Sequence, residues 1–326
     1  MKILLLGIGR WGSNHLRVLK SLPVELYVAE VDAKRLESAR ALGVEHTSVD
    51  YRDFIERVDG AVVVTPAPSH FDLCRTLLEA GKDVFVEKPI TLESKHASVL
   101  ARLADEKKRI LQVGHIFRFD PASQWLRQAV QEGRFGRIKI LRGNFSGFKR
   151  PRNDSGVTFA DAIHFVDLFN YFMGRPPAKV MGHLQDFLGR GMDDESLITL
   201  EYPSAGGPVL GVVESGYHIP GKVREVSVIG EELSAVCDFN VAQYKIKTFQ
   251  HRHVPAGGDF KAVEGEVRQL EFPPEEPLQA ELRAFIQSIE QRRTPLADGW
   301  AGFEAVRVIE GALKAARCGQ AVELAS

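Results

Sequence analysis

A regular alternation of predicted strands and helices over the first 119 residues most constrains the fold of this chain. Apolar runs of strand length lie at 2–7, 24–32, 61–66, 83–89 and 110–115. Helical patterns separate them at 13–22, 33–43, 69–81 and 93–108. Strands and helices that alternate at this spacing form a parallel sheet with helices on both faces. The sequence therefore predicts an α/β, doubly wound parallel sheet over residues 1–119.

The turn after the first predicted strand carries a glycine pattern, GIGRWG, at residues 7–12. Gly7 permits a tight turn, Gly9 lets the backbone approach a pyrophosphate, and Gly12 lets the following helix pack on the strand. The amides of Arg10 and Trp11 then face the phosphates at the positive end of the helix dipole. Because the pattern ends a strand and opens a helix, it predicts a dinucleotide-binding Rossmann domain. A glycine-rich turn without a ligand is the alternative.

An acidic residue, Asp32, stands at the tip of the second predicted strand. A carboxylate at this position accepts hydrogen bonds from the ribose hydroxyls and repels a 2′-phosphate. The cofactor predicted from the sequence is therefore NAD rather than NADP. Lys34 and Arg35 weaken that preference, since either side chain could reach a phosphate.

The fourth predicted strand ends abruptly in Glu87, Lys88 and Pro89. Proline cannot donate to a sheet ladder, and it biases the preceding residue away from helical geometry. Lys88 is therefore expected at the carboxyl edge of the sheet, where ligands bind in open α/β folds. The residues alone leave a second interpretation open, a solvated turn closed by a surface ion pair.

Residues 120–326 lose the alternation, and strand candidates follow one another. These candidates lie at 137–146, 178–185, 196–202, 209–218, 224–230, 234–240, 242–250 and 268–272. Such a succession predicts a second, α+β domain with a large, mostly antiparallel open sheet that carries helices on one face. A broad apolar sheet face is seldom left in water. We therefore expect a homo-oligomer, a dimer or a tetramer, assembled through the other face.

A helix is predicted at 156–174, between the first two of these strands, and it carries polar residues within one arc. They are Asp161, His164, Asp167 and Tyr171. A lone histidine on such a helix more often satisfies a hydrogen bond in the core than it takes part in chemistry. Both interpretations of His164 stay open from the residues alone.

Several of these patterns together resemble the Gfo/Idh/MocA oxidoreductases. They are the glycine pattern, Thr65-Pro66, His70, AGKDVFVEKPIT (80–91) and GHIFRFDP (114–121), with the predicted closing helices near 276–290 and 298–317. The resemblance covers nearly the whole chain. It implies hydride transfer between a nicotinamide cofactor and a hydroxyl or ketone carbon of a sugar, polyol or nucleotide sugar.

The resemblance also implies site residues. Lys88 is then catalytic, ahead of a cis proline, and relays the hydroxyl proton of the substrate, while Glu87 orients it or contacts the cofactor. His164 matches the catalytic histidine of the family. The acid that the family places four residues before this histidine is replaced by Ala160, and Asp161 stands one position later, still beside His164 on a helix.

The predicted catalytic residues are Lys88, His164 and Asp161. The predicted cofactor-binding residues are Gly7, Gly9, Arg10, Trp11, Gly12, Asp32, Thr65, Pro66, His70, Glu87 and Lys88. The predicted substrate-binding residues are Arg118, Arg150, Arg152 and His164, the two loop arginines as an anion clamp. No metal site is expected, because His251 and His253 have no carboxylate or cysteine at ligand spacing beside them.

The composition limits the partners and the compartment. A formal net charge of −1 gives no electrostatic reason to bind nucleic acid or an anionic membrane. Three widely spaced cysteines fit free thiols in a reducing cytoplasm. We therefore expect a cytoplasmic oxidoreductase. Its rival is a catalytically idle, cofactor-sensing or regulatory protein on the same fold, which Ala160 favours.

Overall fold

The computed structural model describes residues 1–324, which divide into two compact units. The first unit comprises Met1–Phe119 and Glu276–Val306, and the second comprises Asp120–Glu275 and the chain from Arg307 onward. The break after residue 119 coincides with the predicted one. In contrast to the prediction, residues 276–306 belong to the first unit, because their helix supplies apolar side chains to its core.

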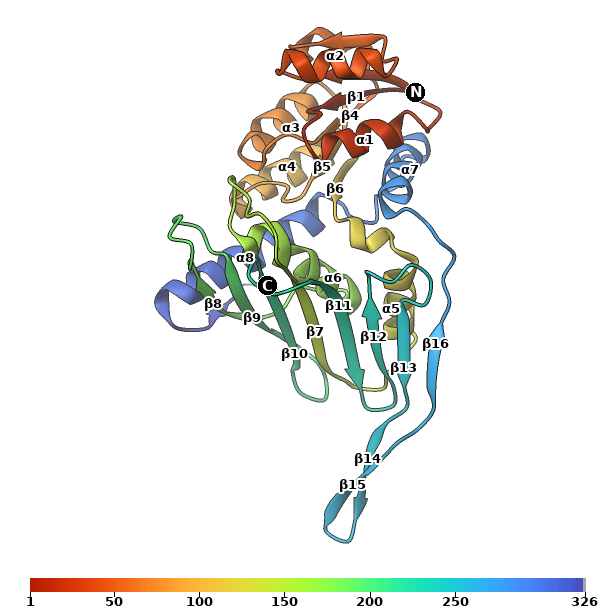
Figure 1. Ribbon diagram of the computed structural model, residues 1–326, viewed down its shortest axis with the longest axis vertical. Coiled ribbons are helices and arrows are strands. Elements are labelled where there is room, and N and C mark those ends of the chain that lie inside the picture. The colour runs from red at the N-terminus through yellow and green to blue at the C-terminus, as the bar shows by residue number, and fades with distance from the viewer. Residues whose placement is uncertain (325–326) are drawn as a thin grey trace. The chain divides into compact units, whose positions relative to one another are not determined.

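Six parallel strands form the sheet of the first unit, in the order β3-β2-β1-β4-β5-β6 (Figure 1). They are β1 (Lys2–Leu6), β2 (Glu25–Ala29), β3 (His46–Ser48), β4 (Gly60–Val63), β5 (Asp83–Glu87) and β6 (Leu111–Gly114). The helices are α1 (Gly12–Leu19), α2 (Ala33–Ala41), α3 (His70–Glu79), α4 (Ser94–Lys107) and α7 (Pro277–Gln291), with shorter turns η1 (Tyr51–Arg57), η2 (Ala67–Ser69) and η3 (Ile116–Phe119). The predicted doubly wound parallel sheet is confirmed, with β3 as a strand that the sequence pattern did not reveal.

The strand order reverses between β1 and β4, so the connections from β1 lead one way and those from β4 the other. In open α/β sheets a ligand crevice forms at such a reversal, outside the carboxyl ends of the strands. The glycine turn at the end of β1 lies at this point.

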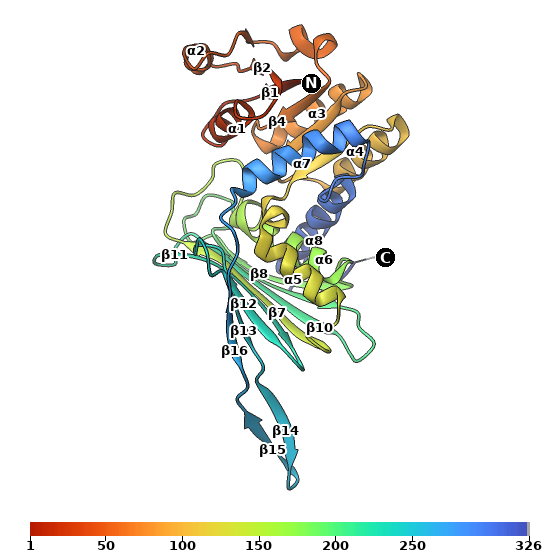
Figure 2. The same ribbon diagram turned by 90° about the vertical axis from the view of Figure 1, so that its right-hand side faces the viewer.

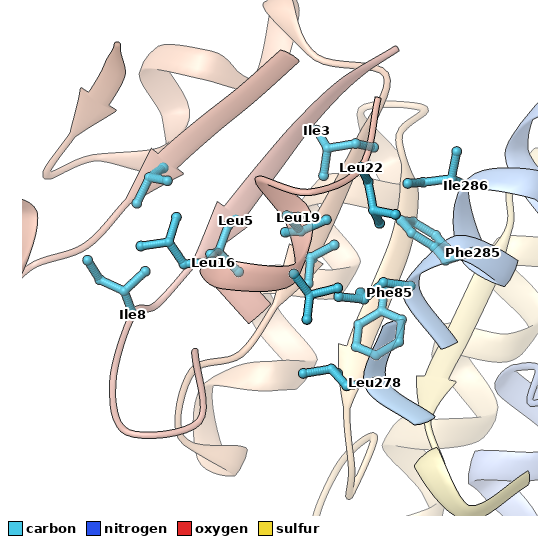
Figure 3. Packing of buried hydrophobic residues seen from close by; sticks show 14 of the residues in the cluster. Ile3, Leu5, Ile8, Leu16, Leu19, Leu22, Phe85, Leu278, Phe285 and Ile286 are labelled. Carbon is cyan, nitrogen blue, oxygen red and sulfur yellow. The ribbon is translucent and has the colours of Figure 1, made fainter. Parts of the chain in front are cut away.

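Helix α7 returns from late in the sequence to complete the core of the first unit (Figure 3). Phe285 of α7 meets Phe85 of β5 edge to face, with ring centroids 5.8 Å apart. Both rings are fully buried. The cluster also takes side chains from β1 and α1, among them Ile3, Leu5, Leu16 and Leu19. Burial of two phenylalanines in this way stabilises the unit by several kcal/mol, about 1.5–3 for each side chain.

A nine-stranded sheet forms the second unit, in the order β16-β13-β12-β11-β7-β10-β9-β8-β17 (Figure 1). The strands are β7 (Ile138–Gly147), β8 (Lys179–Gln185), β9 (Glu195–Tyr202), β10 (Val209–Gly216), β11 (Lys222–Gly230), β12 (Ser234–Asp238), β13 (Ile246–Phe249), β16 (Val267–Leu270) and β17 (Val322–Glu323). Only β7 and β10 pair in parallel among these strands of the described chain. The predicted large, mostly antiparallel sheet is therefore confirmed.

Helices α5 (Pro121–Gln131) and α6 (Ile163–Met173) lie against one face of this sheet (Figure 2). Gly143 of β7 allows α6 to come close, because a Cβ atom there would lie 2.8 Å from Phe165 and 3.2 Å from Phe169. One turn of π-helix, η4 (Thr158–Ala162), leads into α6. Helix α8 (Gly299–Cys318) begins in the first unit and ends in the second.

A separate hairpin, β14 (Arg252–Ala256) and β15 (Asp259–Val263), extends from the end of β13 (Figure 2). Its residues are mostly exposed, including Phe260. The sequence pattern did not predict it, since both strands are short and β14, which reads RHVPA, does not alternate apolar and polar residues.

Candidate active site

The three glycines of the turn in the first unit differ in how closely they are packed. Gly7 has a positive φ of +85°, and a Cβ at Gly12 would lie 2.1 Å from the carbonyl oxygen of Gly7. At Gly9, by contrast, a Cβ would meet nothing closer than the guanidinium of Arg35, at 3.6 Å. The turn thus needs glycine at its two ends for its own shape, and its middle is accessible. This arrangement fits the pyrophosphate of a dinucleotide.

Two acids follow β2, and they have different surroundings. Asp32 caps α2, accepting hydrogen bonds from the amides of Lys34 (2.9 Å) and Arg35 (3.2 Å). Glu30 comes directly after the strand and is buried. Its carboxylate accepts from the amide of Ile8 in the glycine turn, at 2.8 Å, and from the amide of Asp32, at 3.0 Å.

Sequence reasoning missed Glu30 as a candidate for the ribose hydroxyls. The signal was present, because Glu30 is the first residue after an apolar strand and faces the same turn. The rule that counts about twenty residues from the last glycine selected Asp32 instead. The ribose-binding role of Asp32 stays a prediction, and the carboxylate that the structure joins to the glycine turn is that of Glu30.

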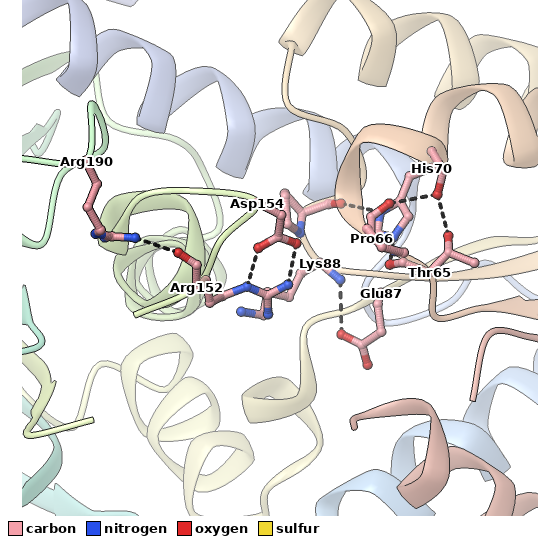
Figure 4. A network of polar contacts seen from close by, with 10 residues as sticks. Thr65, Pro66, His70, Glu87, Lys88, Arg152, Asp154 and Arg190 are labelled. Carbon is pink, nitrogen blue, oxygen red and sulfur yellow. Dashed lines mark hydrogen bonds and ion pairs between the residues drawn. The ribbon is translucent and has the colours of Figure 1, made fainter. Parts of the chain in front are cut away.

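The loop after β4 is joined to the turn after β5 through His70 (Figure 4). The Nε2 atom of His70 lies 2.9 Å from the carbonyl oxygen of Thr65, and its Nδ1 atom lies 2.8 Å from that of Pro89. Both partners can only accept, so a ring N–H of the imidazole is the donor in such a contact. Thr65 is further held by its hydroxyl, 2.7 Å from that of Ser69. Thr65, Pro66 and His70 therefore fix the position of the turn that carries Lys88.

Glu87 is a buried carboxylate rather than half of a surface ion pair. Its Oε1 atom accepts a hydrogen bond from the indole of Trp11, at 2.7 Å, and lies 3.1 Å from Nε2 of His15. Its Oε2 atom accepts from the amide of Lys88, at 3.2 Å (Figure 4). The Lys88–Pro89 peptide bond is cis, as predicted. The solvated-turn interpretation of this segment is therefore wrong.

Burial alone would raise the pKa of Glu87, but its partners outweigh that effect. The nearby imidazole of His15, the indole of Trp11 and the charge of Lys88 together bring the pKa of Glu87 below its usual value. The carboxylate is therefore ionised at neutral pH.

In the second unit, polar residues gather around the ring of Phe145 on β7. We call this set the Phe145 cluster; it consists of Phe145, Lys149, Asp161, His164, Tyr217 and Arg224. His164, in the first turn of α6, stacks on Phe145 with ring centroids 5.1 Å apart. The guanidinium carbon of Arg224 lies 3.6 Å from the centroid of the same ring.

Asp161, on the π-helical turn, forms an ion pair with Lys149. The Nζ atom of Lys149 lies 2.6 Å from Oδ2 of Asp161. The same atom lies 5.3 Å from the ring centroid of Phe145 and 5.4 Å from that of Tyr217. Burial lowers the pKa of Lys149, and the carboxylate of Asp161 opposes that shift. The proposed orienting action of Asp161 on His164 stays a prediction.

The sequence analysis above did not single out Lys149, Tyr217 or Arg224. Arg224 on β11 stands opposite Phe145 on β7 in the sheet register, and Ser215 of β10 stands opposite on the other side. Residues about 80 positions apart meet through this pairing. A single strand pattern does not specify it.

The three arginines that were predicted to bind substrate lie in three different environments. Arg152 forms a bidentate pair with Asp154, at 2.8 and 2.7 Å, and its carbonyl oxygen accepts from Arg190 (Figure 4). Arg150 is exposed. Arg118 is buried and donates to the carbonyl oxygen of Leu296, at 2.8 Å, a contact within the first unit. The substrate-binding roles of these arginines stay predictions.

Two kinds of feature are absent from residues 1–324. No group of three histidine, cysteine or acidic side chains within this range could hold a metal ion. Likewise, none of the helices described is both long and apolar enough to span a membrane.

Comparisons with known proteins find relatives for both the N-terminal and the C-terminal domain of the chain. A sequence model described as "Oxidoreductase family, NAD-binding Rossmann fold" matches residues 1–115, and one described as "Oxidoreductase family, C-terminal alpha/beta domain" matches residues 127–324. Scyllo-inositol 2-dehydrogenase (NAD(+)) of Bacillus subtilis is 28% identical over 312 residues, which cover 89% of this chain and 86% of that protein. UDP-N-acetylglucosamine 3-dehydrogenase of Acidithiobacillus ferrooxidans is 27% identical over 319 residues, 96% of each chain. A crystal form of the latter enzyme has the same fold, with a TM-score of 0.84, 23% identity and 98% of each chain covered.

Loss of the acid in the Lys149–Asp161 pair should leave a pH-dependent signature. In Asp161→Asn the ammonium stays covered by two rings without its counter-charge, so burial lowers the pKa of Lys149 further. Unfolded Lys149 keeps its ordinary pKa and binds more protons between the two pKa values, so stability rises with pH in that window. We expect the variant to be less stable than the native protein at pH 7, by on the order of 1 kcal/mol. The difference should shrink toward pH 10 when urea unfolding is followed across this range.

Glu266→Gln is the matched control, because Glu266 pairs with Arg268 on the exposed surface of the same unit. This variant should differ from the native protein by the same small amount at every pH. A difference for Asp161→Asn that stays constant from pH 7 to 10 would mean that Asp161 does not hold the proton of Lys149.

Proposed function

Because the chain belongs to the Gfo/Idh/MocA family of NAD-binding oxidoreductases, we propose that it transfers a hydride between NAD and a hydroxyl or ketone carbon of a sugar, polyol or nucleotide sugar. The observation that carries this proposal is the position of Lys88. It follows β5 directly, and its amide is bonded to a buried carboxylate that also holds Trp11 of the glycine turn. A basic side chain thus lies at the same sheet edge as the dinucleotide turn.

The residues that would hold the cofactor are those of the glycine turn and the acids after β2. The open backbone at Gly9 would receive the pyrophosphate, and Glu30 has lone pairs left for the ribose hydroxyls. Bound NAD supplies or accepts the hydride. The chain itself must move the proton of a hydroxyl group, which is too weak an acid to lose it unaided.

Lys88 is our candidate for that proton transfer, at its Nζ atom. His70 and Glu87 fix the backbone on either side of Lys88 through Pro89 and the Lys88 amide, so its side chain starts from a defined position. His164 is the candidate from the second unit, where the ring of Phe145 holds the imidazole plane.

The relatives suggest the range of substrates. Their names include a neutral polyol, scyllo-inositol, and an anionic nucleotide sugar, UDP-N-acetylglucosamine. We favour a substrate with an anionic group, because the loop at 148–154 and the neighbouring strand provide Arg150, Arg152 and Arg224. Asp154 already pairs with Arg152. A phosphate or carboxylate would then compete with Asp154 for that guanidinium.

A rival function has one observation in its favour. Ala160 stands where relatives of this type are expected to carry an acid, and Asp161 pairs with Lys149. A protein that binds NAD without catalysis would account for both.

We further propose a cytoplasmic homo-oligomer, supported by three cysteines without disulfides and by exposed Leu197 and Leu210 on the uncovered sheet face.

A substrate screen tests the proposal. Purified protein is given NAD⁺ with scyllo-inositol, myo-inositol, hexoses and UDP-N-acetylglucosamine, and NADH formation is followed at 340 nm, about the absorbance maximum of the reduced ring. We expect turnover of at least one compound. With an anionic substrate, Arg150→Ala and Arg152→Ala should raise KM several-fold and change kcat less. NADH binding without any turnover would favour the rival function, and an unchanged KM in both variants would contradict the anion clamp.

Replacement of Lys88 should separate catalysis from cofactor binding. In Lys88→Ala we expect kcat to fall by roughly two to four orders of magnitude, because proton transfer loses its basic group. The Kd for NADH, measured by fluorescence, should change little. Lys82→Ala, at the opposite end of β5, is the control and should behave like the native protein. Near-normal kcat in Lys88→Ala would mean that Lys88 only shapes the turn.

Cofactor preference follows from the acids after β2. We expect NADH to bind roughly tenfold more tightly than NADPH, about 1.4 kcal/mol, because Glu30 and Asp32 repel a 2′-phosphate. The guanidinium of Arg35 lies 3.9 Å from the carboxylate of Glu30 and 3.7 Å from that of Asp32. These two carboxylates therefore already balance its positive charge. Glu30→Gln should reduce the preference for NADH over NADPH more than Asp32→Asn does. The asparagine in the second variant still caps α2. Tighter binding of NADPH to the native protein would overturn this expectation.

A further inference from the structure

A buried histidine on α1 contacts the acid that precedes Lys88. His15 is fully buried, and its two ring nitrogens face two acceptors. Nε2 lies 3.1 Å from Oε1 of Glu87, and Nδ1 lies 3.3 Å from the carbonyl oxygen of Trp11. The imidazole also meets the rings of Trp11 and Phe85 at 5.8 Å each. This packing fixes the orientation of the imidazole ring.

The same carboxylate oxygen accepts a hydrogen bond from the glycine turn. Trp11 is half exposed, yet its indole N–H points inward and lies 2.7 Å from Oε1 of Glu87. The backbone of Gly114 on β6 closes the other side, since a Cβ there would lie 2.9 Å from the carboxyl carbon. The carboxylate of Glu87 is thus held between three neighbouring segments of the first unit.

Position makes His15 the main partner of this carboxylate, since its fully buried Nε2 atom lies 3.1 Å from Oε1. The titratable groups that face Glu87 are His15 from α1 and Lys88 from its own segment, and the indole of Trp11 adds an uncharged donor. An ionised carboxylate is destabilised by burial, and it can take up a proton instead when a polar partner is removed. Neutral Glu87 would keep one oxygen as an acceptor, but its other oxygen would carry a proton and repel a donor.

We propose that His15 is a positioning residue, which acts through Glu87 to hold Lys88 and the glycine turn in fixed relation at one sheet edge. This inference rests on the proposed function for its kinetic part. Its structural part, that His15 keeps Glu87 ionised and bonded to Trp11, stands without any cofactor or substrate. The two parts can therefore fail separately.

Two amide variants of His15 separate its two contacts. The amide of His15→Gln reaches the position of Nε2 and can donate to Glu87, whereas that of His15→Asn reaches only the position of Nδ1. Both remove the titratable imidazole, and both leave a polar group in the same cavity. A role in packing alone predicts that the larger and smaller amides differ in stability without any effect of pH.

The direct readout is the indole N–H signal of Trp11 in ¹⁵N–¹H spectra of the protein without cofactor. The chain has three tryptophans. Trp11→Phe assigns the signal, and Trp125 and Trp300 serve as internal references. In the native protein the signal should stay constant from pH 9 down to about 5, because Glu87 stays ionised. In His15→Asn it should shift at a midpoint at least one pH unit higher than in the native protein, and in His15→Gln at a midpoint between the two.

The kinetic readout uses the substrate found in the screen. His15→Asn should lower kcat by on the order of tenfold to a hundredfold at pH 7, with partial recovery at pH 9 and a smaller change in KM. His15→Gln should restore much of the activity. His46→Asn is the matched control: it removes a histidine of the same unit that pairs with exposed Glu25, and it should change neither readout.

The outcomes decide between the two parts. If the Trp11 signal of both His15 variants titrates as in the native protein, His15 does not control Glu87 and the proposal is overturned. If the signal moves as expected but kcat is unchanged, the link from Glu87 to Lys88 is wrong. If the native protein turns over no substrate, the proposed function fails, while the spectra still test the contact between His15 and Glu87.

Discussion

The parallel direction of all six strands in the first unit is the constraint on which its candidate site depends. Parallel strands bring their carboxyl ends to one edge. Gly7, Glu30, Thr65 and Glu87 each follow or end such a strand, although about 80 residues separate the first from the last. No sequence-local contact joins them. Hydrogen bonds of Ile8 to Glu30 and of Trp11 to Glu87 then turn this common edge into a connected set of groups.

Much of this unit could be predicted from sequence because its signals are local. Strand–helix alternation, the glycine spacing and the proline after Lys88 each act within a few residues. The failures concern choices that depend on tertiary contacts. β3 has three residues and no apolar run, so only its pairing with β2 identifies it. Asp32 and Glu30 are both acids near one strand end, and only the direction of each side chain distinguishes a helix cap from a carboxylate beside the turn.

The second unit was predictable as an architecture but less so as a site. Its strands alternate buried and exposed residues, which the sequence displays directly. The Phe145 cluster, by contrast, depends on register: β11 places Arg224 opposite Phe145, and a shift of one residue would turn Arg224 to the other face. The π-helical turn adds a further shift that no periodicity of 3.6 residues reveals, and it directs Asp161 toward Lys149.

The return of α7 to the first unit has a consequence for how the chain is made. Synthesis runs from the N-terminus, and Glu276 leaves the ribosome about 160 residues after Phe119. At about 5–20 residues per second, the parallel sheet waits roughly 8 to 30 s for this helix. Until then Phe85 and the apolar side of α1 have no cover from Phe285. Chaperones that bind exposed apolar surface should therefore bind the nascent chain. Truncation before α7 should yield insoluble protein rather than an isolated nucleotide-binding domain.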